Sequence, residues 1–405
     1  MDNCLYDLFS LQFKQNPFPT FAQMRGHDPV YKQLSPNGVT TWYVTGYEDV
    51  LAVLKDNDRF VKDARQARPQ AKRPSSSQQP SIQQLINQNM LFSDPPDHTR
   101  LRALVNQAFT PRRIEQMDGR IQAITNHLLD KAAVAGQMNL IADFALPLPV
   151  IVICELLGIP AADQEDVTDY SQAIISPRSR GLSSRERKQK MRALVAYLQQ
   201  MFADRQQQPQ DDLVTALVQA EMAGDKLNEA ELSSMVALLL VTGHETTVNL
   251  IGNGVVALLH RPQQLQLLLA DGGLWEMAVE ELLRYDGPVE TSTTRWVRRD
   301  CEFRGQQMKQ GDIMRVVLAS ANRDGRCFAA ADKLDINRAD VRKHLAFGHG
   351  IHYCLGAPLA RLEGRIALRT LFTRFPTLQL AAPTAELKWR SGVLFRGLES
   401  LPLNW

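Results

Sequence analysis

One cysteine is framed by glycines in the stretch Phe347-Gly348-His349-Gly350-Ile351-His352-Tyr353-Cys354-Leu355-Gly356. Pro358 follows and suits a first helical turn, and apolar residues then recur at helical spacing: Leu355, Leu359, Leu362 and Ile366. Cys354 is therefore predicted to lie at the N-terminus of a helix. There, unsatisfied backbone N–H groups and the positive end of the helix dipole stabilise a thiolate, which is a good soft ligand for iron. The glycines let the backbone approach a flat ligand without clashes from Cβ atoms.

The spacing Phe-x-x-Gly-x-x-x-Cys-x-Gly resembles the heme-binding loop of the cytochrome P450 family. In that family the cysteine thiolate is the proximal ligand of heme iron and donates electron density that favours O–O cleavage. The resemblance implies heme b as the cofactor and Cys354 as the metal ligand, with further cofactor contacts from Phe347, Gly348, His352 and Gly356. The alternative is a structural thiol in a glycine-rich turn, because a buried free cysteine behaves as a small hydrophobe.

Composition argues against several classes of protein. The chain has 405 residues, 44% of them hydrophobic, and a formal net charge of +2, so no nucleic-acid partner is expected. None of the five cysteines forms a Cys-x-x-Cys pair, so neither a disulfide framework nor a zinc site is indicated. This cysteine usage fits a reducing cytoplasm.

No targeting or membrane segment is visible. Residues 1–21 mix charged residues and prolines with apolar ones, unlike a signal peptide. The longest apolar stretch, residues 146–160, is broken by Pro147 and Pro149 and falls short of the roughly 20 residues that a membrane span needs. We therefore expect a cytoplasmic protein without a membrane anchor, and a monomer.

Hydrophobic periodicity predicts a mainly α protein with small β-sheets. Helical spacing covers residues 113–133, 185–205, 229–259 and 274–285, and short alternating runs indicate strands at 40–44, 301–303 and 313–317. No repeat or linker is visible, so one domain is expected over residues 1–405. The resemblance implies the cytochrome P450 fold, with heme between a distal oxygen-binding helix and a proximal cysteine-loop helix.

Two segments are predicted to be irregular. Residues 64–88 are rich in Arg, Gln, Ser and Pro, and residues 176–187 are rich in Ser, Arg and Gly. By composition alone they are solvated surface loops. The family resemblance places both at the lid of the substrate pocket, a common role for long loops in compact domains.

Polar residues interrupt an otherwise apolar helix near residues 242–247. Gly243 costs a helix about 1 kcal/mol relative to alanine, and threonine is a poor helix former. The pattern resembles the family's oxygen-binding motif, in which Gly243 opens room beside the sixth iron position, Thr246 donates a hydrogen bond to dioxygen and Glu245 relays protons. The alternative is a satisfied polar kink in a core helix. Thr242 stands where alanine or glycine is usual, and its hydroxyl either bonds a carbonyl one turn back or faces the substrate.

Four cationic or donor side chains match positions that bind the heme propionates in the family. They are His98, Arg102, Arg295 and His352. Carboxylates need such partners when partly buried. The alternatives are an exposed basic face for Arg102 and a capped loop for His352. Arg100 should point away, toward the surface.

Glu281 and Arg284 lie one helical turn apart, hence on one face of a helix. Most such pairs are surface ion pairs of little energetic value. The resemblance instead implies a buried pair, completed by Arg338, that holds the proximal loop in place. Its predicted role is structural.

A basic face is predicted behind the cysteine. Arg361, Arg365 and Arg369 recur every four residues, and four more cations could join them: Arg112, Arg113, Arg342 and Lys343. Such a run is either a solvated helix face or a docking surface for an acidic electron donor. The resemblance implies a ferredoxin and its reductase as that donor system.

The function implied is that of a monooxygenase that hydroxylates or epoxidises an apolar, moderately large molecule with O2. Residues 288–291 and 344–361 look most like those of soluble bacterial members that tailor polyketides and macrolides. Residues expected to line the substrate pocket are Leu239, Thr242, Gly243, Val289, Thr291 and Leu394. One rival is a peroxide-driven oxidase of fatty acids or terpenes, which typically lacks the acid–alcohol pair retained here. The other is a non-catalytic heme sensor or carrier, against which the lack of a visible signalling module counts.

Overall fold

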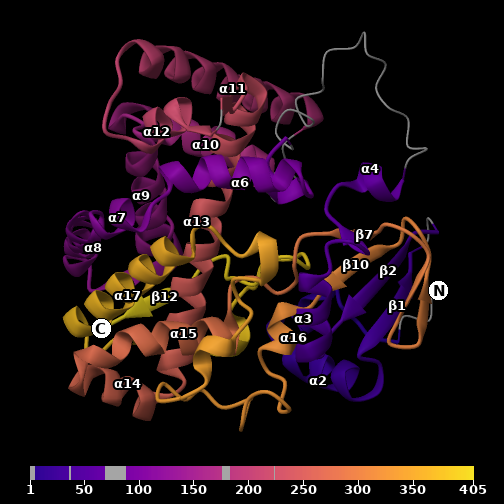
Figure 1. Ribbon diagram of the computed structural model, residues 1–405. Helices are drawn as coiled ribbons and strands as arrows, with labels where there is room; N and C mark the ends of the chain where they lie inside the picture. Colours follow the sequence, from indigo (N-terminus) through magenta and orange to yellow (C-terminus); the bar gives the residue numbers. More distant parts are fainter. Residues whose placement is uncertain (1–4, 36–37, 69–87, 176–182, 223) are drawn as a thin grey trace. The chain divides into compact units, whose positions relative to one another are not determined.

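The computed structural model describes residues 5–35, 38–68, 88–175, 183–222 and 224–405, and the chain separates into two compact units. Unit 1 comprises residues 1–69, 122–146 and 246–405, and unit 2 comprises residues 70–121 and 147–245. The elements are mainly helices with small sheets, which confirms the predicted fold class (Figure 1). The expectation of one functional domain over the whole chain stays a prediction.

A five-stranded sheet forms one part of unit 1 (Figure 1). Its order is β1 (Val30–Leu34), β2 (Thr40–Val44), β10 (Ile313–Val316), β7 (Arg295–Val297) and β3 (Phe60–Val61). Strands β2 and β10 are parallel, and the other pairs are antiparallel. Apolar side chains of the sheet and of α3 (Tyr47–Lys55) share one buried cluster, which includes Trp42, Val44, Val50, Val53, Phe60 and Met314. The strands at 40–44, 301–303 and 313–316 confirm the predicted ones.

Smaller sheets complete the β structure of unit 1. Strands β11 (Gln379–Leu380), β12 (Pro402–Asn404) and β4 (Gln137–Asn139) form one sheet in that order. Strands β8 (Cys301–Phe303) and β9 (Gln306–Met308) form a hairpin. Its two turn residues, Arg304 and Gly305, both have positive φ values, 50° and 76°. That backbone conformation is the one a tight two-residue hairpin requires.

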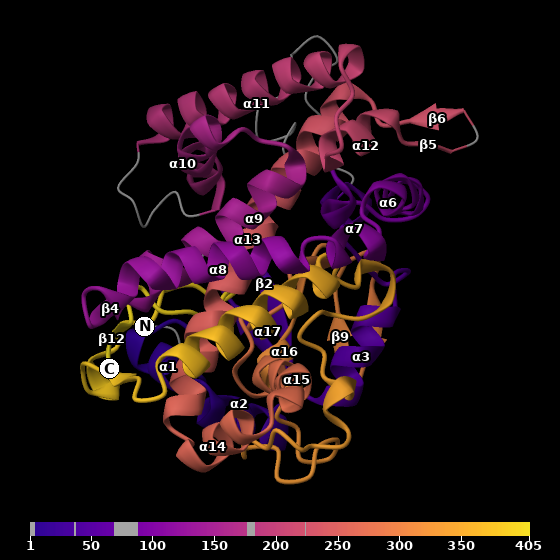
Figure 2. The same ribbon diagram turned by 90° about the vertical axis from the view of Figure 1, so that its left-hand side faces the viewer.

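In unit 1, α15 (Trp275–Asp286) and α17 (Ala357–Arg374) pack against the C-terminal half of a long helix, α13 (Glu229–Leu259), where Leu282 and Leu368 lie close to Gly254. Helix α17 packs against α15, and Figure 2 shows the two helices next to each other. A Cβ added to Gly364 of α17 would lie 2.9 Å from Cδ2 of Leu250, so glycine permits the close approach of α17 and α13. Unit 1 also contains α1 (Leu11–Gln15), α2 (Phe18–His27), α4 (Ala64–Ala67), most of α8 (Asp118–Ala133), a π-helix (Ile141–Ala145), α14 (Pro262–Ala270) and α16 (Leu318–Ala321).

Unit 2 is mostly helical. Its helices are α6 (Asp97–Ala108), α7 (Pro111–Glu115), α9 (Pro147–Leu157), α10 (Gln164–Ile175), α11 (Ser184–Gln207), α12 (Leu213–Gln219) and the N-terminal half of α13. A short hairpin joins β5 (Glu221–Met222) to β6 (Asp225–Lys226). Helix α11 begins with a capping box, in which the Ser183 and Glu186 side chains each bond the other's backbone N–H.

Two expectations about local structure need correction. The predicted helix over 113–133 is two helices, α7 and α8 (Asp118–Ala133), because Met117 N–H bonds the Ile114 carbonyl and tightens the last turn of α7. The segments expected to be irregular are partly helical, since residues 64–67 form α4 and residues 184–187 begin α11. The rest of those segments, residues 69–87 and 176–182, lies outside the described residues.

Helix α13 is the one helix in the described part of the chain that is long and apolar enough to cross a membrane, judged by length and composition alone. Its most apolar window has a mean hydropathy of 1.3, yet 72% of that window is buried inside the protein. This burial is what a core helix shows.

Candidate functional site

Cys354 lies in an exposed turn that leads directly into α17. Its backbone N–H donates to the Phe347 carbonyl at 3.0 Å, which closes the loop. Gly348 and Gly350 have φ values of 71° and 74° in the left-handed region. A Cβ on Gly350 would also lie 2.9 Å from the Leu54 carbonyl oxygen in α3. Both glycines are therefore required by the path of the loop.

The surroundings of the Cys354 sulfur fit an iron atom held in a flat organic group. The thiol is exposed and stands at the N-terminus of an 18-residue helix, where the dipole favours a thiolate. Apart from its chain neighbours, a Cβ added to Gly356 would meet one atom within 4 Å, the Cys354 sulfur at 4.0 Å. Within the described residues no group of three or more His, Cys, Asp and Glu could hold a metal ion.

Two of the four candidate propionate partners belong to unit 1. Arg295, on β7, is 1% exposed, and its Nη1 donates to the Phe60 carbonyl at 3.0 Å and to Asn57 Oδ1 at 3.3 Å. His352 is half-buried at the end of the short helix Gly350–His352. A guanidinium held this deeply is suited to an anionic partner.

The other two candidates lie on α6 in unit 2. His98 is buried and Arg102 is half-buried, one helical turn apart. Arg100 forms ion pairs with Glu231 and, at 3.4 Å, with Asp225. Arg100 therefore has acidic partners within unit 2, in keeping with the expectation that it points away from the other two.

Helix α13 carries the candidate oxygen-binding residues. Glu245 is buried and Thr246, its neighbour, is half-buried. The Thr242 hydroxyl donates to the Leu238 carbonyl at 2.7 Å, which is the first of the two alternatives for this residue. Gly243 also has a packing role within unit 2, while its predicted role beside the iron stays a prediction. A Cβ there would lie 3.0 Å from Cγ1 of Ile153, so glycine makes room for α9.

The predicted pocket residues fall on several elements. Leu239 and Thr242 lie one turn apart on α13, Leu239 buried and Thr242 exposed. In unit 1, Val289 bridges to Phe395, so the segments that carry Val289, Thr291 and Leu394 run side by side. Thr291 is 2% exposed and its hydroxyl donates to the Val393 carbonyl at 2.8 Å. That hydroxyl ties the two segments together.

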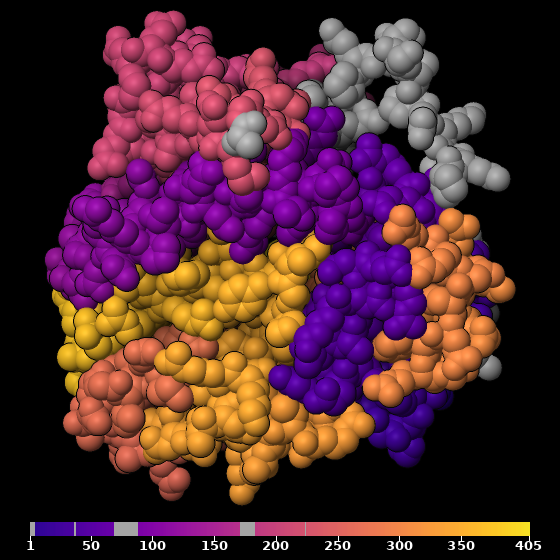
Figure 3. Space-filling model, in the orientation of Figure 1, coloured from indigo at the N-terminus to yellow at the C-terminus, as the bar shows by residue number. Residues whose placement is uncertain are grey.

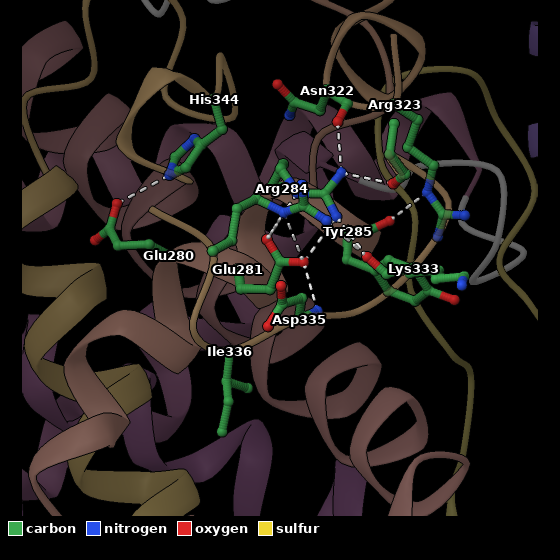
Figure 4. Close-up of polar contacts among 12 residues, drawn as sticks. Glu280, Glu281, Arg284, Tyr285, Asn322, Arg323, Lys333, Asp335, Ile336 and His344 are labelled. Carbon is green, nitrogen blue, oxygen red and sulfur yellow. Dashed lines mark hydrogen bonds and ion pairs between the residues drawn. The ribbon is translucent and has the colours of Figure 1, made fainter. Parts of the chain in front are cut away.

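The predicted Glu–Arg core is confirmed as a buried network (Figure 4). Glu281 accepts from Arg284 Nε and Nη2, both at 2.7 Å, and from Arg338 Nε at 3.1 Å. Arg284 also donates to three backbone carbonyls, those of Asn322, Ala331 and Lys333. The network therefore ties α15 to the backbone between Asn322 and Asp335, upstream of the cysteine loop. Its predicted role in holding that loop stays a prediction.

The predicted basic face is partly neutralised. The exposed side of α17 contributes to the yellow surface in Figure 3. The half-buried Arg361 pairs with the buried Glu280 of α15, and Arg342 pairs with the exposed Glu276 at 2.7 Å. Arg369 bonds a neutral partner, Gln122, at 3.3 Å. Arg369 forms no ion pair within the described part of the chain.

Several buried charged residues were not found from the sequence. Lys14 and Glu290 form an ion pair at 2.7 Å with both side chains 1% exposed. Burial raises the pKa of Glu290 and lowers that of Lys14. Glu280 binds His344 as well as Arg361. These partners are far apart in sequence, so no local residue spacing predicts that the ion pairs form.

Glu363 is a further buried acid, on α17. It is 1% exposed, and its Oε2 has no hydrogen-bond partner among the described residues. Burial raises the pKa of this carboxyl well above its ordinary value of 4.5. The unfolded chain thus loses this proton more readily than the folded protein, so wild-type stability falls as the pH rises above about 4.5.

Glu363→Gln is therefore expected to raise the denaturation temperature at pH 7, because glutamine has no proton to lose. The difference from wild type should narrow as the pH falls toward 4.5. Thermal unfolding followed by far-UV circular dichroism measures it, with the exposed Glu386→Gln as the matched control. A difference that does not change with pH would contradict the assignment of a neutral carboxyl.

Comparison with known proteins identifies the class. A model of the family described as "Cytochrome P450" matches residues 4–271 and 273–395. The chain is 41% identical over 409 residues to "Polyketide biosynthesis cytochrome P450 PksS" of Bacillus subtilis strain 168, covering 100% of this chain and 99% of that protein. It is 39% identical over 388 residues to "Mycinamicin IV hydroxylase/epoxidase" of Micromonospora griseorubida, covering 95% and 94%. The solved structure of the Bacillus PksS protein superposes with a TM-score of 0.91 at 40% identity, covering 98% and 99%.

The chain therefore belongs to the cytochrome P450 family and has its fold. It is an oxidoreductase that incorporates oxygen from O2 into its substrate. Membership implies a heme-iron cofactor, and the exposed Cys354 at the start of α17 is the residue whose setting fits iron.

Proposed function

We propose that this chain uses heme b to hydroxylate or epoxidise an apolar, moderately large polyketide or macrolide, with electrons from a ferredoxin and its reductase. The observation that carries the proposal is the exposed Cys354 beside Gly356 at the N-terminus of α17. The names of the relatives support the substrate class, since one refers to polyketide biosynthesis and another to mycinamicin IV. We place the protein in the cytoplasm as a monomer.

In this proposal each candidate residue has one task. The Cys354 thiolate would bind the iron, and Phe347, Gly348 and Gly356 would form the loop that holds the cofactor. The heme carboxylates would be held by four side chains: His98, Arg102, Arg295 and His352. Heme, when bound, supplies the oxidative chemistry, and the protein supplies positioning and protons.

The substrate pocket would be mostly apolar, with a few polar contacts. Leu239, Val289 and Leu394 would supply apolar walls, and Gly243 and Thr242 would shape the helix beside them. The Thr291 and Thr242 hydroxyls are both donated to backbone carbonyls, so neither is a ready donor to the substrate. A substrate with few required hydrogen bonds and a large carbon skeleton suits such walls.

The test is a product assay with the heme-loaded protein, a surrogate ferredoxin and its reductase. Macrolides and linear polyketides should yield oxygenated products that depend on NADPH and O2. Fatty acids and small terpenes are the matched comparison. Oxidation of fatty acids alone, driven by hydrogen peroxide and not by reductase, would replace this proposal with the peroxide-driven one.

Thr246 and Glu245 would hold and move the protons that oxygen reduction consumes. Thr246→Ala should keep the spectrum of the carbon monoxide complex but divert reducing equivalents to hydrogen peroxide, because the alcohol that passes the proton is gone. Positioned general acids contribute factors of about 10² to 10⁴ in rate. Product and peroxide per NADPH consumed are the measurement.

Thr247→Ala, at the neighbouring threonine, is the control for helix perturbation, and Glu245→Gln tests the second member of the pair. Unchanged coupling of NADPH to product in both Thr246→Ala and Glu245→Gln would show that other groups deliver the protons.

The electron donor would dock on the exposed side of α17. Arg369 is the best-supported contact, because its hydrogen-bond partner Gln122 is neutral and no acidic partner of this guanidinium is found among the described residues. Complementary charge mainly accelerates association and is screened by salt. Arg365, between Arg361 and Arg369 on the same helix, would extend this surface.

A further inference from the structure

One buried carboxylate contacts both flanks of the cysteine loop. Glu280, on α15, is 2% exposed. Its Oε2 accepts a hydrogen bond from His344, upstream of Cys354, at 2.9 Å. The same carboxylate accepts from two nitrogens of Arg361, downstream on α17, with Nη2 at 3.0 Å. Figure 4 shows Glu280 turned toward His344, while the adjacent Glu281 points into the Arg284 network.

His344 is oriented by the loop itself. Its Nδ1 accepts the backbone N–H of Ala346 at 3.1 Å and so carries no proton. The hydrogen atom of the neutral ring is therefore on Nε2, which donates to Glu280. His344 thus joins the first residues of the loop to α15.

Arg361 also contacts two side chains of the cysteine loop. Its guanidinium lies over the Phe347 ring, 4.5 Å from the centroid, and its Nη1 donates to the Tyr353 hydroxyl at 3.2 Å. Phe347 in turn accepts the backbone N–H of Cys354 through its carbonyl. A continuous set of contacts therefore runs from Glu280 through Arg361 and Phe347 to the cysteine.

Burial alone would raise the pKa of the Glu280 carboxyl, but hydrogen bonds from His344 and Arg361 and the Arg361 charge lower it to about 2. Glu280 is thus ionised at neutral pH and needs both partners. Removal of either would leave a buried, under-compensated charge. The loop that these partners hold contains two glycines with positive φ, so side-chain contacts must supply much of its rigidity.

We propose that Glu280, His344 and Arg361 are positioning residues that fix the direction of the Cys354 thiolate, and that Arg361 is not part of the donor-docking surface. This inference rests on the proposed role of Cys354 as iron ligand. It gives Arg361 a function different from that of Arg369, although both lie on the same predicted stripe. Partners that orient a metal ligand are known to tune the bond between metal and ligand.

The experiment follows the ligand bond spectroscopically in the heme-loaded protein. The reduced carbon monoxide complex is warmed gently, and the rate at which the thiolate-type absorption band is lost is recorded. Arg361→Ala, Arg361→Lys and Glu280→Gln should lose the band roughly tenfold faster than wild type, because each removes charge-assisted hydrogen bonds at the loop. Far-UV circular dichroism on the same samples separates loss of the ligand from global unfolding.

Arg342→Ala is the matched control. It also breaks an arginine–glutamate pair with α15, but here the side chains of Arg342 and Glu276 are both exposed, 67% and 66%. It should lose the band at the wild-type rate. Arg361→Lys is the discriminating variant, because lysine keeps the positive charge and cannot reproduce the planar fork that grips Glu280 and covers Phe347.

Binding to an acidic [2Fe–2S] ferredoxin, titrated at several salt concentrations, is measured in parallel. If Arg361→Ala keeps the band and weakens only salt-dependent ferredoxin binding, while Arg361→Lys behaves as wild type, Arg361 is a docking residue and the inference is overturned. Wild-type rates in both Arg361→Ala and Glu280→Gln would also overturn it, with the proposed function intact. A wild-type protein without any thiolate-type band would remove the proposed function itself.

Discussion

Cys354→Ser is expected to abolish the carbon monoxide absorption band that gives the family its name, and monooxygenase activity with it. The serine hydroxyl does not ionise near neutral pH, so the exposed end of α17 would lose its soft anionic donor. The fold should survive, because Cys354 is exposed and its replacement is nearly isosteric. The reduced, carbon monoxide-bound difference spectrum measures the change, with circular dichroism as the test of folding.

The other described cysteines provide the control. Burial raises the pKa of the Cys154 thiol to about 12 and also raises those of Cys301 and Cys327. Burial therefore favours the neutral thiol at each, so Cys154→Ser, Cys301→Ser and Cys327→Ser should all keep the band. A Cys354→Ser protein that still shows the band would end the assignment of the ligand.

The parts of the fold that depend on short-range pattern were predictable. The turn chemistry and spacing around Cys354 predicted the helix that begins at Ala357, and the periodicity predicted α13 within its observed bounds. The Glu281–Arg284 pair was visible as a one-turn spacing, and the family resemblance supplied Arg338. The two helices and the Glu281–Arg284 pair are each encoded by residues close together in the sequence.

Features that depend on distant partners were not predictable. Nothing in the sequence near Arg361 shows that Glu280 neutralises it, and the stripe of arginines was accordingly predicted to be more basic than it is. The spacing around Gly243 could not reveal that Ile153 packs against it. Charge compensation and close packing are properties of the folded chain, and a helical spacing reports only which side chains share a face.

Arg284→Ala is expected to have the second largest effect and to leave little folded, heme-binding protein. The substitution removes two hydrogen bonds at 2.7 Å from the fully buried Glu281 carboxylate. It also removes the side-chain donor of the Asn322 and Ala331 carbonyls, while the Lys333 carbonyl keeps Arg338 Nη2 at 3.1 Å. Breaking a buried ion pair by removing one partner costs about 3–5 kcal/mol, a large share of the roughly 5–15 kcal/mol by which proteins are stable. Yield of soluble protein, heme content and denaturation temperature are the measurements.

Arg342→Ala again provides the contrast, because its exposed pair with Glu276 should contribute about 0–1 kcal/mol. Arg284→Lys separates charge from geometry. Lysine keeps the positive charge but cannot donate at once to Glu281 and to the carbonyls of Asn322, Ala331 and Lys333. It should therefore also destabilise the protein strongly. A denaturation temperature near that of wild type in Arg284→Lys would mean that net charge, and not the fork of donors, holds the segment in front of the cysteine loop.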